Sequence, residues 1–356
     1  MSHGFYLRPT AFVDAPFGHD GKVARLAGGL NWFSALEVLS DDGSRLVTVE
    51  SVPELLDQLG AEARTIWERL TSARAPLTLS TRIVRLDQPQ VVGILNVTPD
   101  SFSDGGAHMD PGAAAEAGFA MTAAGAAIVD VGGESTRPGS KAVWEQDEID
   151  RILPVIARLA ASGTAISIDT RKSAVMNAAL GAGAALVNDV SALTFDPLSA
   201  RSIAKTGCPV VLMHHQGTPE TMQQSPCYRR PVLLEVYDWL EERIEFAVTA
   251  GIDRSKIIVD PGIGFGKTVQ HNLQLLNGLA LFHGLGCPIM LGASRKRMIG
   301  ALSGEAPADQ RLAGSLALAL KGAEQGTQLL RVHDVPETLQ ALRVWRGMRD
   351  AALAPS

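Results

Sequence analysis

The chain has 356 residues, enough for one large domain with a smaller appendage or for two domains of ordinary size. Its 46% apolar and 20% charged residues are typical of a soluble α/β protein, and its formal net charge of -6 argues against a broad nucleic-acid-binding surface. A pocket for small anionic ligands remains compatible with that charge.

The three cysteines are isolated in the sequence. Cys208, Cys227 and Cys287 form no C-x-x-C pair and have no His cluster at zinc spacing, so we expect a reducing compartment. No N-terminal stretch has the pattern of a signal peptide, and no apolar run reaches the roughly 18 residues of a membrane span. The sequence therefore predicts a cytoplasmic protein.

The N-terminal part of the chain differs from the rest. Residues 1–75 contain a candidate strand at 45–49 and a candidate helix at 53–70, with no residues that point to chemistry. We expect a small α/β extension that packs on the main domain or on a partner subunit. Residues 76–90 are predicted to form a hairpin that closes the bottom of the main domain, and residues 351–356 a tail.

From about residue 90 onward, a short apolar run, a polar or Gly-rich turn and an amphipathic Ala/Leu-rich stretch repeat in that order. This rhythm is typical of βα units. The predicted strands are 91–97, 126–131, 165–168, 185–187, 209–213, 256–259, 288–291 and 329–332. Helix-forming composition with apolar residues three and four apart occurs between them, for example at 113–124, 145–161, 232–250 and 309–323.

The strand pattern indicates the fold class. Continuous rather than alternating apolar strands imply burial on both faces, as in a parallel sheet. Eight βα units within residues 76–350 fit an α/β protein of the (β/α)8 TIM barrel type by count and length. A doubly wound open sheet is the alternative, but it usually has a G-x-G-x-x-G turn after its first strand, which this chain lacks.

Polar residues follow all eight predicted strands. In a barrel these ends share one face, where active sites are built. A single Asp, Asn or His at a strand end is more often a turn former or a structural residue, so the argument rests on their joint occurrence. In chain order the residues at these ends that could bind or catalyse are Asn96, Asp130, Asp169, Asn188, Asp189, the apolar Met213, His214, His215, Asp260, Ser294, Arg295, Lys296, Arg331, His333 and Asp334.

The buried acidic and amide groups predict one part of the ligand. Asp169, Asn188 and Asp260 need partners that donate hydrogen bonds, and a flat heterocycle with several N–H groups supplies them. A carboxylate facing the guanidine-like edge of a pterin would accept two parallel hydrogen bonds.

The cations predict the other part of the ligand. Arg137, Lys296 and Arg331, with His333, suit a portion that carries phosphate or carboxylate groups. Asn96 is a hard oxygen ligand that could help hold Mg2+ against a diphosphate. The segment D-P-G-I-G-F-G-K-T does not form a phosphate loop, because the first glycine of that motif falls on Pro261.

Eight strings match one known family in order and spacing. They are G-I-L-N-V-T-P-D-S-F-S-D-G-G at 93–106, D-V-G-G-E-S-T-R-P-G at 130–139, I-S-I-D-T at 166–170, V-N-D-V at 187–190, L-M-H at 212–214, D-P-G-I-G-F-G-K at 260–267, S-R-K at 294–296 and R-V-H-D-V at 331–335. With these strings the chain resembles dihydropteroate synthase over about residues 76–350.

The resemblance implies an activity. Members condense (7,8-dihydropterin-6-yl)methyl diphosphate with 4-aminobenzoate, giving 7,8-dihydropteroate and pyrophosphate in folate biosynthesis. It also implies Mg2+ as cofactor, a homodimer, inhibition by sulfonamides and no nucleic-acid or membrane partner. Because no protein nucleophile is needed, the absence of a G-x-S-x-G elbow and of a plausible Cys–His pair is consistent with it.

The resemblance also implies roles for individual residues, which we give as expectations. The residues expected to bind the pterin are Asp169, Asn188, Asp260 and Lys296, with Met213 and Phe265 as apolar walls of its slot. Those of the diphosphate site with its Mg2+ are Asn96, Arg331 and His333. Those of the 4-aminobenzoate pocket are Phe102, Thr136, Arg137 and Pro138, and Ser294 is a further substrate-binding candidate.

Two features depart from the family pattern. Arg297 stands where many members carry Ser near the 4-aminobenzoate carboxylate, and the extension at 1–75 is absent from compact members. Two other functions are possible alternatives. A methyltransferase of the methyltetrahydrofolate type would use a similar pterin slot, but it does not need the T-P-D-S-F, S-T-R-P-G and S-R-K strings. The other alternative is a catalytically inactive barrel, and the intact motifs at every strand end argue against it.

Overall fold

The structure, a computed structural model, describes residues 4–40, 43–98, 110–135, 143–218 and 221–353. Four of the predicted site residues, Phe102, Thr136, Arg137 and Pro138, lie outside these ranges. The description that follows concerns only the described residues.

The main domain is a parallel eight-stranded sheet in the order β12-β11-β10-β9-β8-β7-β14-β13. A bridge between Val259 and Ile289 joins its two end strands, so the sheet closes into a barrel. Its strands are β7 (Gln90–Asn96), β8 (Ile128–Gly132), β9 (Ile166–Asp169), β10 (Leu186–Asp189), β11 (Val210–Met213), β12 (Ile257–Asp260), β13 (Met290–Leu291) and β14 (Leu329–Val332). The predicted TIM barrel is confirmed.

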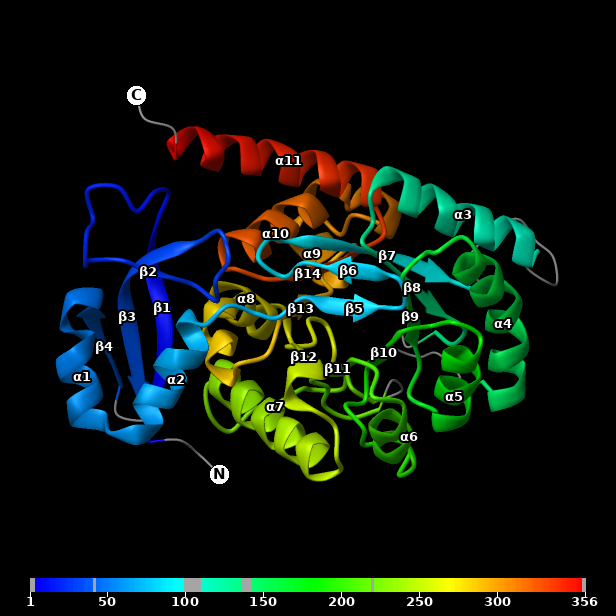
Figure 1. Cartoon of the computed structure of the whole chain (residues 1–356), viewed down its shortest axis with the longest axis horizontal. Coiled ribbons are helices and arrows are strands. Elements are labelled where there is room, and N and C mark those ends of the chain that lie inside the picture. Colours follow the sequence, from blue (N-terminus) through cyan, green and yellow to red (C-terminus); the bar gives the residue numbers. More distant parts are fainter. Residues whose placement is uncertain (1–3, 41–42, 99–109, 136–142, 219–220, 354–356) are drawn as a thin grey trace.

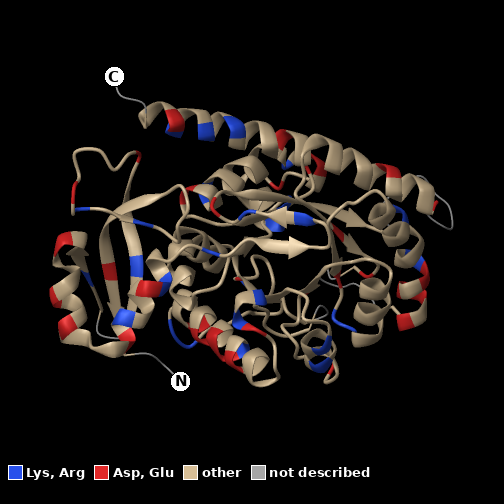
Figure 2. Cartoon of the chain, viewed as in Figure 1, with Lys and Arg blue, Asp and Glu red and all other residues tan. Residues whose placement is uncertain are grey.

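Helices surround the barrel (Figure 1). They are α3 (Pro111–Ala124), α4 (Glu145–Ala161), α5 (Ser173–Gly181), α6 (Ser199–Thr206), α7 (Val232–Thr249), α8 (Val269–Asn277), α9 (Arg297–Leu302), α10 (Leu312–Glu324) and α11 (Val335–Ala352). The prediction at 309–323 began too early, because Ala308–Gln310 form a separate 3-10 turn before α10. In Figure 2 the Asp and Glu positions are red along α4 and α7, and both helices have exposed as well as buried positions.

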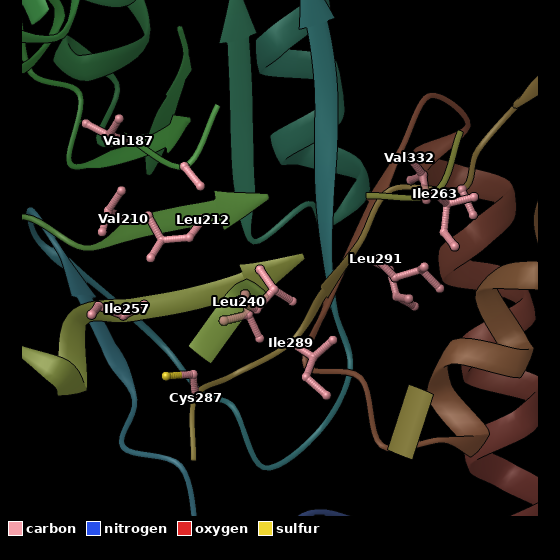
Figure 3. Packing of buried hydrophobic residues seen from close by; sticks show 14 of the residues in the cluster. Val187, Val210, Leu212, Leu240, Ile257, Ile263, Cys287, Ile289, Leu291 and Val332 are labelled. Atoms are coloured by element: carbon pink, nitrogen blue, oxygen red, sulfur yellow. The ribbon is translucent and has the colours of Figure 1, made fainter. Parts of the chain in front are cut away.

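Each barrel strand has two buried faces. Side chains on the outer face, such as Val187, Val210 and Ile257, join a cluster with helical residues such as Leu240 (Figure 3). Burial of this kind contributes about 25 cal/mol for each Å2 of apolar surface removed from water. This explains the continuous apolar runs in the sequence, since neither face of a strand meets solvent.

A hairpin closes the bottom of the barrel. Strands β5 (Leu77–Leu79) and β6 (Arg82–Val84) pair antiparallel, and Leu77, Leu79 and Val84 are buried. They pack against the first inward-facing side chains of the strands, among them Val92, Ile128, Ala165, Leu186, Val211, Ile258, Met290 and Leu329. The predicted hairpin is confirmed, and this end of the barrel is apolar and filled.

The extension is a mixed α/β layer beside the barrel, drawn in blue in Figure 1. Its antiparallel sheet has the order β1-β3-β2, with β4 paired to β3. The elements are β1 (Tyr6–Val13), β2 (Ala24–Arg25), β3 (Trp32–Ser40), β4 (Gly43–Thr48), α1 (Val52–Leu59) and α2 (Ala61–Thr71). The sequence predicted β4 but missed β1 and β3.

The single helix predicted at 53–70 is wrong. Gly60 has φ +83°, a value that side chains other than glycine rarely adopt, and the chain turns there between α1 and α2. The two helices cover one face of the sheet, where Leu55, Ile66 and Leu70 pack with Phe33. The extension therefore has an apolar cluster of its own.

Tyr6 fastens the extension to the barrel. Its hydroxyl donates to the Asp238 carboxylate on α7 at 2.7 Å and accepts from Arg230 at 3.1 Å. Its ring meets the Tyr237 ring edge to face, with the centroids 5.4 Å apart. Asn31 adds a second contact, because its side-chain amide donates to the Ala323 carbonyl at 2.7 Å.

None of the described helices combines the length and apolar character needed to cross a membrane.

We predict that Tyr6→Ala lowers the free energy of unfolding by about 3–5 kcal/mol, because it empties a buried aromatic position and leaves the Asp238 and Arg230 groups without the hydroxyl. Urea unfolding measures the change. Phe17→Ala is the matched control, since the Phe17 side chain is 66% exposed and should cost little. Equal losses in the two variants would show that Tyr6 does not fasten the extension.

Candidate active site

The alternation of side chains along the strands gathers the predicted polar residues inside the barrel. In β8 and β12, the inward-facing Ile128 and Ile258 of the apolar bottom are followed two residues later by Asp130 and Asp260. The strand register then sets polar side chains next to one another, since Asn188 pairs with Asp169. The carboxyl end of the barrel is thus polar on its inner face.

Arg331 on β14 is the centre of this polar layer. Its Nε donates to Asp130 Oδ2 at 2.6 Å, and one terminal nitrogen donates to Asp169 Oδ2 at 2.7 Å. The Asn188 side-chain amide also donates to Asp130 Oδ2, at 3.0 Å. One guanidinium and one amide thereby join four strands of the barrel.

The charges in this layer do not balance. Asp130 and Asp169 share one guanidinium, and Oδ1 of each is buried with no hydrogen-bond partner among the described residues. Burial raises the pKa of Asp169 to about 7, although Arg331 opposes the shift. Burial lowers the pKa of Arg331, but the Asp130 and Asp169 carboxylates more than offset this and raise it above its ordinary value. The layer therefore has acceptor atoms that a ligand with N–H groups would satisfy.

Asp260 lies at the end of β12, across the strand register from Met213. Its Oδ1 accepts a hydrogen bond from the Gly262 N–H at 2.7 Å, and burial raises its pKa. A Cβ at Gly292 would lie 3.6 Å from Asp260 Oδ2, so Gly292 is a direct neighbour of that oxygen. The predicted neighbours Asp260 and Met213 are brought together.

Lys296 and Phe265 form the next wall. The Lys296 ammonium lies over the Phe265 ring, 4.1 Å from its centroid, in a cation–π contact. Gly264, with φ +84°, makes room for this contact, because a side chain there would come within 3.2 Å of Lys296 Cδ. An aromatic ring and a cation thus stand side by side, as expected for the pterin slot.

Asn96, Ser294 and His333 complete the group. His333 Nδ1 is 3.0 Å from the Ser294 hydroxyl. A Cβ at Gly132 would lie 3.5 Å from the Asp169 Cβ and 3.8 Å from Asn96 Oδ1, so Asn96 and Asp169 flank the same glycine. All predicted site residues in the described part of the chain therefore lie at the carboxyl ends of the barrel strands.

The residues present fit a magnesium site that the substrate completes. The described residues contain no group of three or more His, Cys, Asp or Glu that could hold a metal by itself. Mg2+ usually binds one or two protein oxygens together with waters and substrate phosphates. The Asn96 amide oxygen, which flanks Gly132 together with the Asp169 side chain, suits such a site.

Comparison with known proteins decides the family. A family model described as pterin binding enzyme matches residues 92–333. The chain belongs to this family. Dihydropteroate synthase from Escherichia coli strain K12 is 47% identical over 260 residues, covering 73% of this chain and 91% of that protein.

Solved structures of the family agree with this result. Yersinia pestis dihydropteroate synthase with a sulfonamide drug is 45% identical with a TM-score of 0.74, covering 78% of this chain and 100% of that one. The Xanthomonas albilineans enzyme with 4-aminobenzoic acid is 45% identical with a TM-score of 0.73, covering 78% and 99%. The resemblance seen in the motifs is confirmed.

Two residues of this pterin-binding enzyme were not selected from the sequence. Asp130 was noted at a strand end, but its link to Arg331 and Asn188 depends on pairing across the barrel. Lys267 belongs to the segment set aside as a failed phosphate loop, yet its side chain is 3% exposed and bonded to His214. Its burial has no sequence signal, since lysine is usually a surface residue.

Other polar residues of the barrel mouth have structural partners. Asp189 accepts hydrogen bonds from Ser191 and the Leu193 N–H, which shape its own loop. Arg295 pairs with Asp334. Arg297, the departure from the family pattern, is the first residue of α9, next to Lys296.

We predict that Arg331→Met lowers the free energy of unfolding by about 3–5 kcal/mol above the pKa of Asp169, because it leaves two buried carboxylates without their cation. The loss should shrink as the pH falls. Without Arg331 the folded-state pKa of Asp169 rises further above its unfolded value, so the folded variant binds a proton that the unfolded chain does not.

Urea unfolding at several pH values measures this dependence. Arg295→Met is the control, because its partly exposed pair with Asp334 is worth about 0–1 kcal/mol and adds little pH dependence. A loss for Arg331→Met that is the same at every pH would contradict the account.

Proposed function

We propose that this chain catalyses the dihydropteroate synthase reaction: (7,8-dihydropterin-6-yl)methyl diphosphate and 4-aminobenzoate give 7,8-dihydropteroate and pyrophosphate. The observation that supports it most is the set of acceptor groups, Asp169, Asn188 and Asp260, on the inner face of a barrel whose relatives are dihydropteroate synthases. A reaction of this kind places the protein in folate biosynthesis.

In this proposal the pterin ring lies in the polar layer. Asp260 accepts two hydrogen bonds from the guanidine-like edge of the ring, and Asp169 and Asn188 bind further edge atoms. Met213 and Phe265 cover the faces of the ring, and Lys296 lies beside Phe265. The excess negative charge of the layer favours the cationic pterin fragment that forms as the diphosphate departs.

The leaving group lies on the cationic side of the site. Arg331 and His333 stabilise the departing diphosphate, and Ser294 orients His333 through the hydrogen bond to Nδ1. Mg2+, when bound by Asn96 and the diphosphate, would neutralise part of the developing charge. Once the C–O bond to diphosphate has broken, the amine of 4-aminobenzoate attacks the methylene carbon, and the attacking nitrogen releases one proton.

The remaining assignments are also part of the proposal. Phe102, Thr136, Arg137 and Pro138 form the 4-aminobenzoate pocket, as the resemblance implies. The enzyme is a cytoplasmic homodimer that acts on small molecules, not on nucleic acid or membranes. Residues 76–350 carry the chemistry, which is supported by the position of every proposed group after residue 90, whereas residues 1–75 and the tail at 351–356 contribute no catalytic group.

A steady-state assay of pyrophosphate release tests the function. Release should require both the pterin diphosphate and 4-aminobenzoate, and 7,8-dihydropteroate should appear in equal amount. Pyrophosphate release without 4-aminobenzoate would indicate a hydrolase, and no release with both substrates would indicate an inactive barrel.

We predict that sulfamethoxazole inhibits this chain competitively with 4-aminobenzoate, because it carries the same aniline ring and amine. The similarity to a relative solved with a sulfonamide drug supports this expectation. Apparent KM for 4-aminobenzoate should rise with inhibitor concentration while kcat stays constant. Inhibition that does not depend on 4-aminobenzoate concentration would contradict it.

Arg297→Ser is the informative companion variant. If the long cationic side chain selects a carboxylate over a sulfonamide, this variant should raise KM for 4-aminobenzoate and leave the inhibition constant of the drug unchanged. A parallel change in both constants would remove Arg297 as a selective residue.

A further inference from the structure

The loop after β12 encloses a buried lysine. The Lys267 side chain is 3% exposed, and its Nζ lies 2.8 Å from His214 Nδ1. The same nitrogen donates to the Phe265 carbonyl oxygen at 3.0 Å. Neither hydrogen-bond partner is a carboxylate, which is unusual for a buried lysine.

This loop lies directly on the end of β11. Gly262 has φ +68°, and a Cβ at that position would stand 1.8 Å from the His214 carbonyl oxygen. Lys267 Nζ is 3.4 Å from the same point. Only a glycine at position 262 allows the loop to approach the His214 carbonyl so closely, and the Lys267 amine lies next to this glycine.

The loop carries two groups of the proposed pterin slot. The Gly262 N–H donates to Asp260 Oδ1 at 2.7 Å, which links the carboxylate to the turn above Lys267. The Phe265 ring supports the Lys296 ammonium, while the Phe265 carbonyl is held by Lys267. A displacement of the Lys267 amine would therefore move both the carboxylate and the ring.

Other loop carbonyls have other donors. Gln223 donates to the Gly264 carbonyl at 2.6 Å, and the Tyr228 hydroxyl donates to the Gly266 carbonyl at 2.9 Å. These contacts fix the outer part of the loop. Lys267 fixes the part that faces the barrel, at the residue whose ring forms the wall of the slot.

The protonation of the pair follows from its burial. Burial and the nearby Lys267 lower the pKa of His214 well below its ordinary value, which favours a neutral imidazole in contact with Lys267 Nζ. Burial also lowers the pKa of Lys267, while Asp260 opposes the shift. The burial of Lys267 therefore costs stability that Asp260 only partly offsets.

We propose that Lys267 is a positioning residue for the pterin: through His214 Nδ1 and the Phe265 carbonyl it sets the places of Asp260 and Phe265. The inference rests on the proposed function of this site. Lys267 does not touch the reacting atoms, and it acts on the affinity for the pterin substrate and not on 4-aminobenzoate.

The experiment compares Lys267→Met, which removes both hydrogen bonds, with Lys267→Gln, whose amide keeps an N–H donor. We expect Lys267→Met to raise KM for the pterin diphosphate about tenfold, the effect of losing a buried hydrogen bond. KM for 4-aminobenzoate, measured at saturating pterin diphosphate, should stay unchanged. Lys267→Gln should recover part of the pterin KM, and Lys205→Met, at an exposed position late in α6, is the control.

A merely structural role would lower Tm and the active fraction without changing KM for one substrate alone. An unchanged pterin KM in Lys267→Met, an equal change in both KM values, or no recovery in Lys267→Gln would overturn the proposal. A wild-type chain that releases no pyrophosphate would instead refute the proposed function.

A second pair of variants covers the case in which Lys267→Met does not fold. His214→Asn keeps an acceptor near the place of Nδ1, whereas His214→Leu removes it. The pterin KM should rise in His214→Leu and stay closer to the wild-type value in His214→Asn. Equal pterin KM values in this pair would refute the positioning role of the Lys267–His214 contact.

Discussion

The buried contact of Arg331 with Asp130 and Asp169 is the interaction on which the polar half of the barrel depends. One guanidinium faces two carboxylates whose remaining oxygens lack partners among the described residues. Such an arrangement is expensive in a low-dielectric interior unless another molecule completes it. The protein tolerates it because the lower half of the barrel is a filled apolar plug, closed by the β5–β6 hairpin. The apolar packing with the hairpin thus lies at one end of the barrel, and the proposed ligand-binding groups lie at the other.

The loops at the carboxyl end of the barrel also shape the site. Gly264 leaves the space that the Lys296 side chain occupies, so the site depends on backbone approach at this position as well as on the side chains themselves. Lys267 contributes from within the loop, because it donates to the Phe265 carbonyl and lies close to Gly262, whose N–H donates to Asp260. The extension fastens to α7 through Tyr6 and adds an apolar cluster of its own, without a residue of the proposed chemistry.

The sequence predicted the barrel well because parallel strands buried on both faces leave continuous apolar runs, such as residues 329–332. It missed β1, whose run Y-L-R-P-T-A-F-V mixes buried and exposed side chains, as an antiparallel strand at the edge of a sheet does. It joined α1 and α2, because the effect of Gly60 depends on its backbone angle. The Arg331–Asp130 contact spans 201 positions, and no local pattern reveals it. The strings that resemble the family located the strand ends, whereas the hydrogen bonds between side chains at those ends could be found only from the structure.

The central claim is that the acceptor groups of Asp169, Asn188 and Asp260 at the barrel mouth bind the donor edge of a pterin. Calorimetric titration of Asp260→Ala with 6-hydroxymethyl-7,8-dihydropterin, the substrate alcohol without diphosphate, tests it most directly. The account predicts an unchanged fold and a loss of affinity of about 100-fold or more, because the ligand loses a charged acceptor for two hydrogen bonds. An affinity equal to that of the wild type would contradict it.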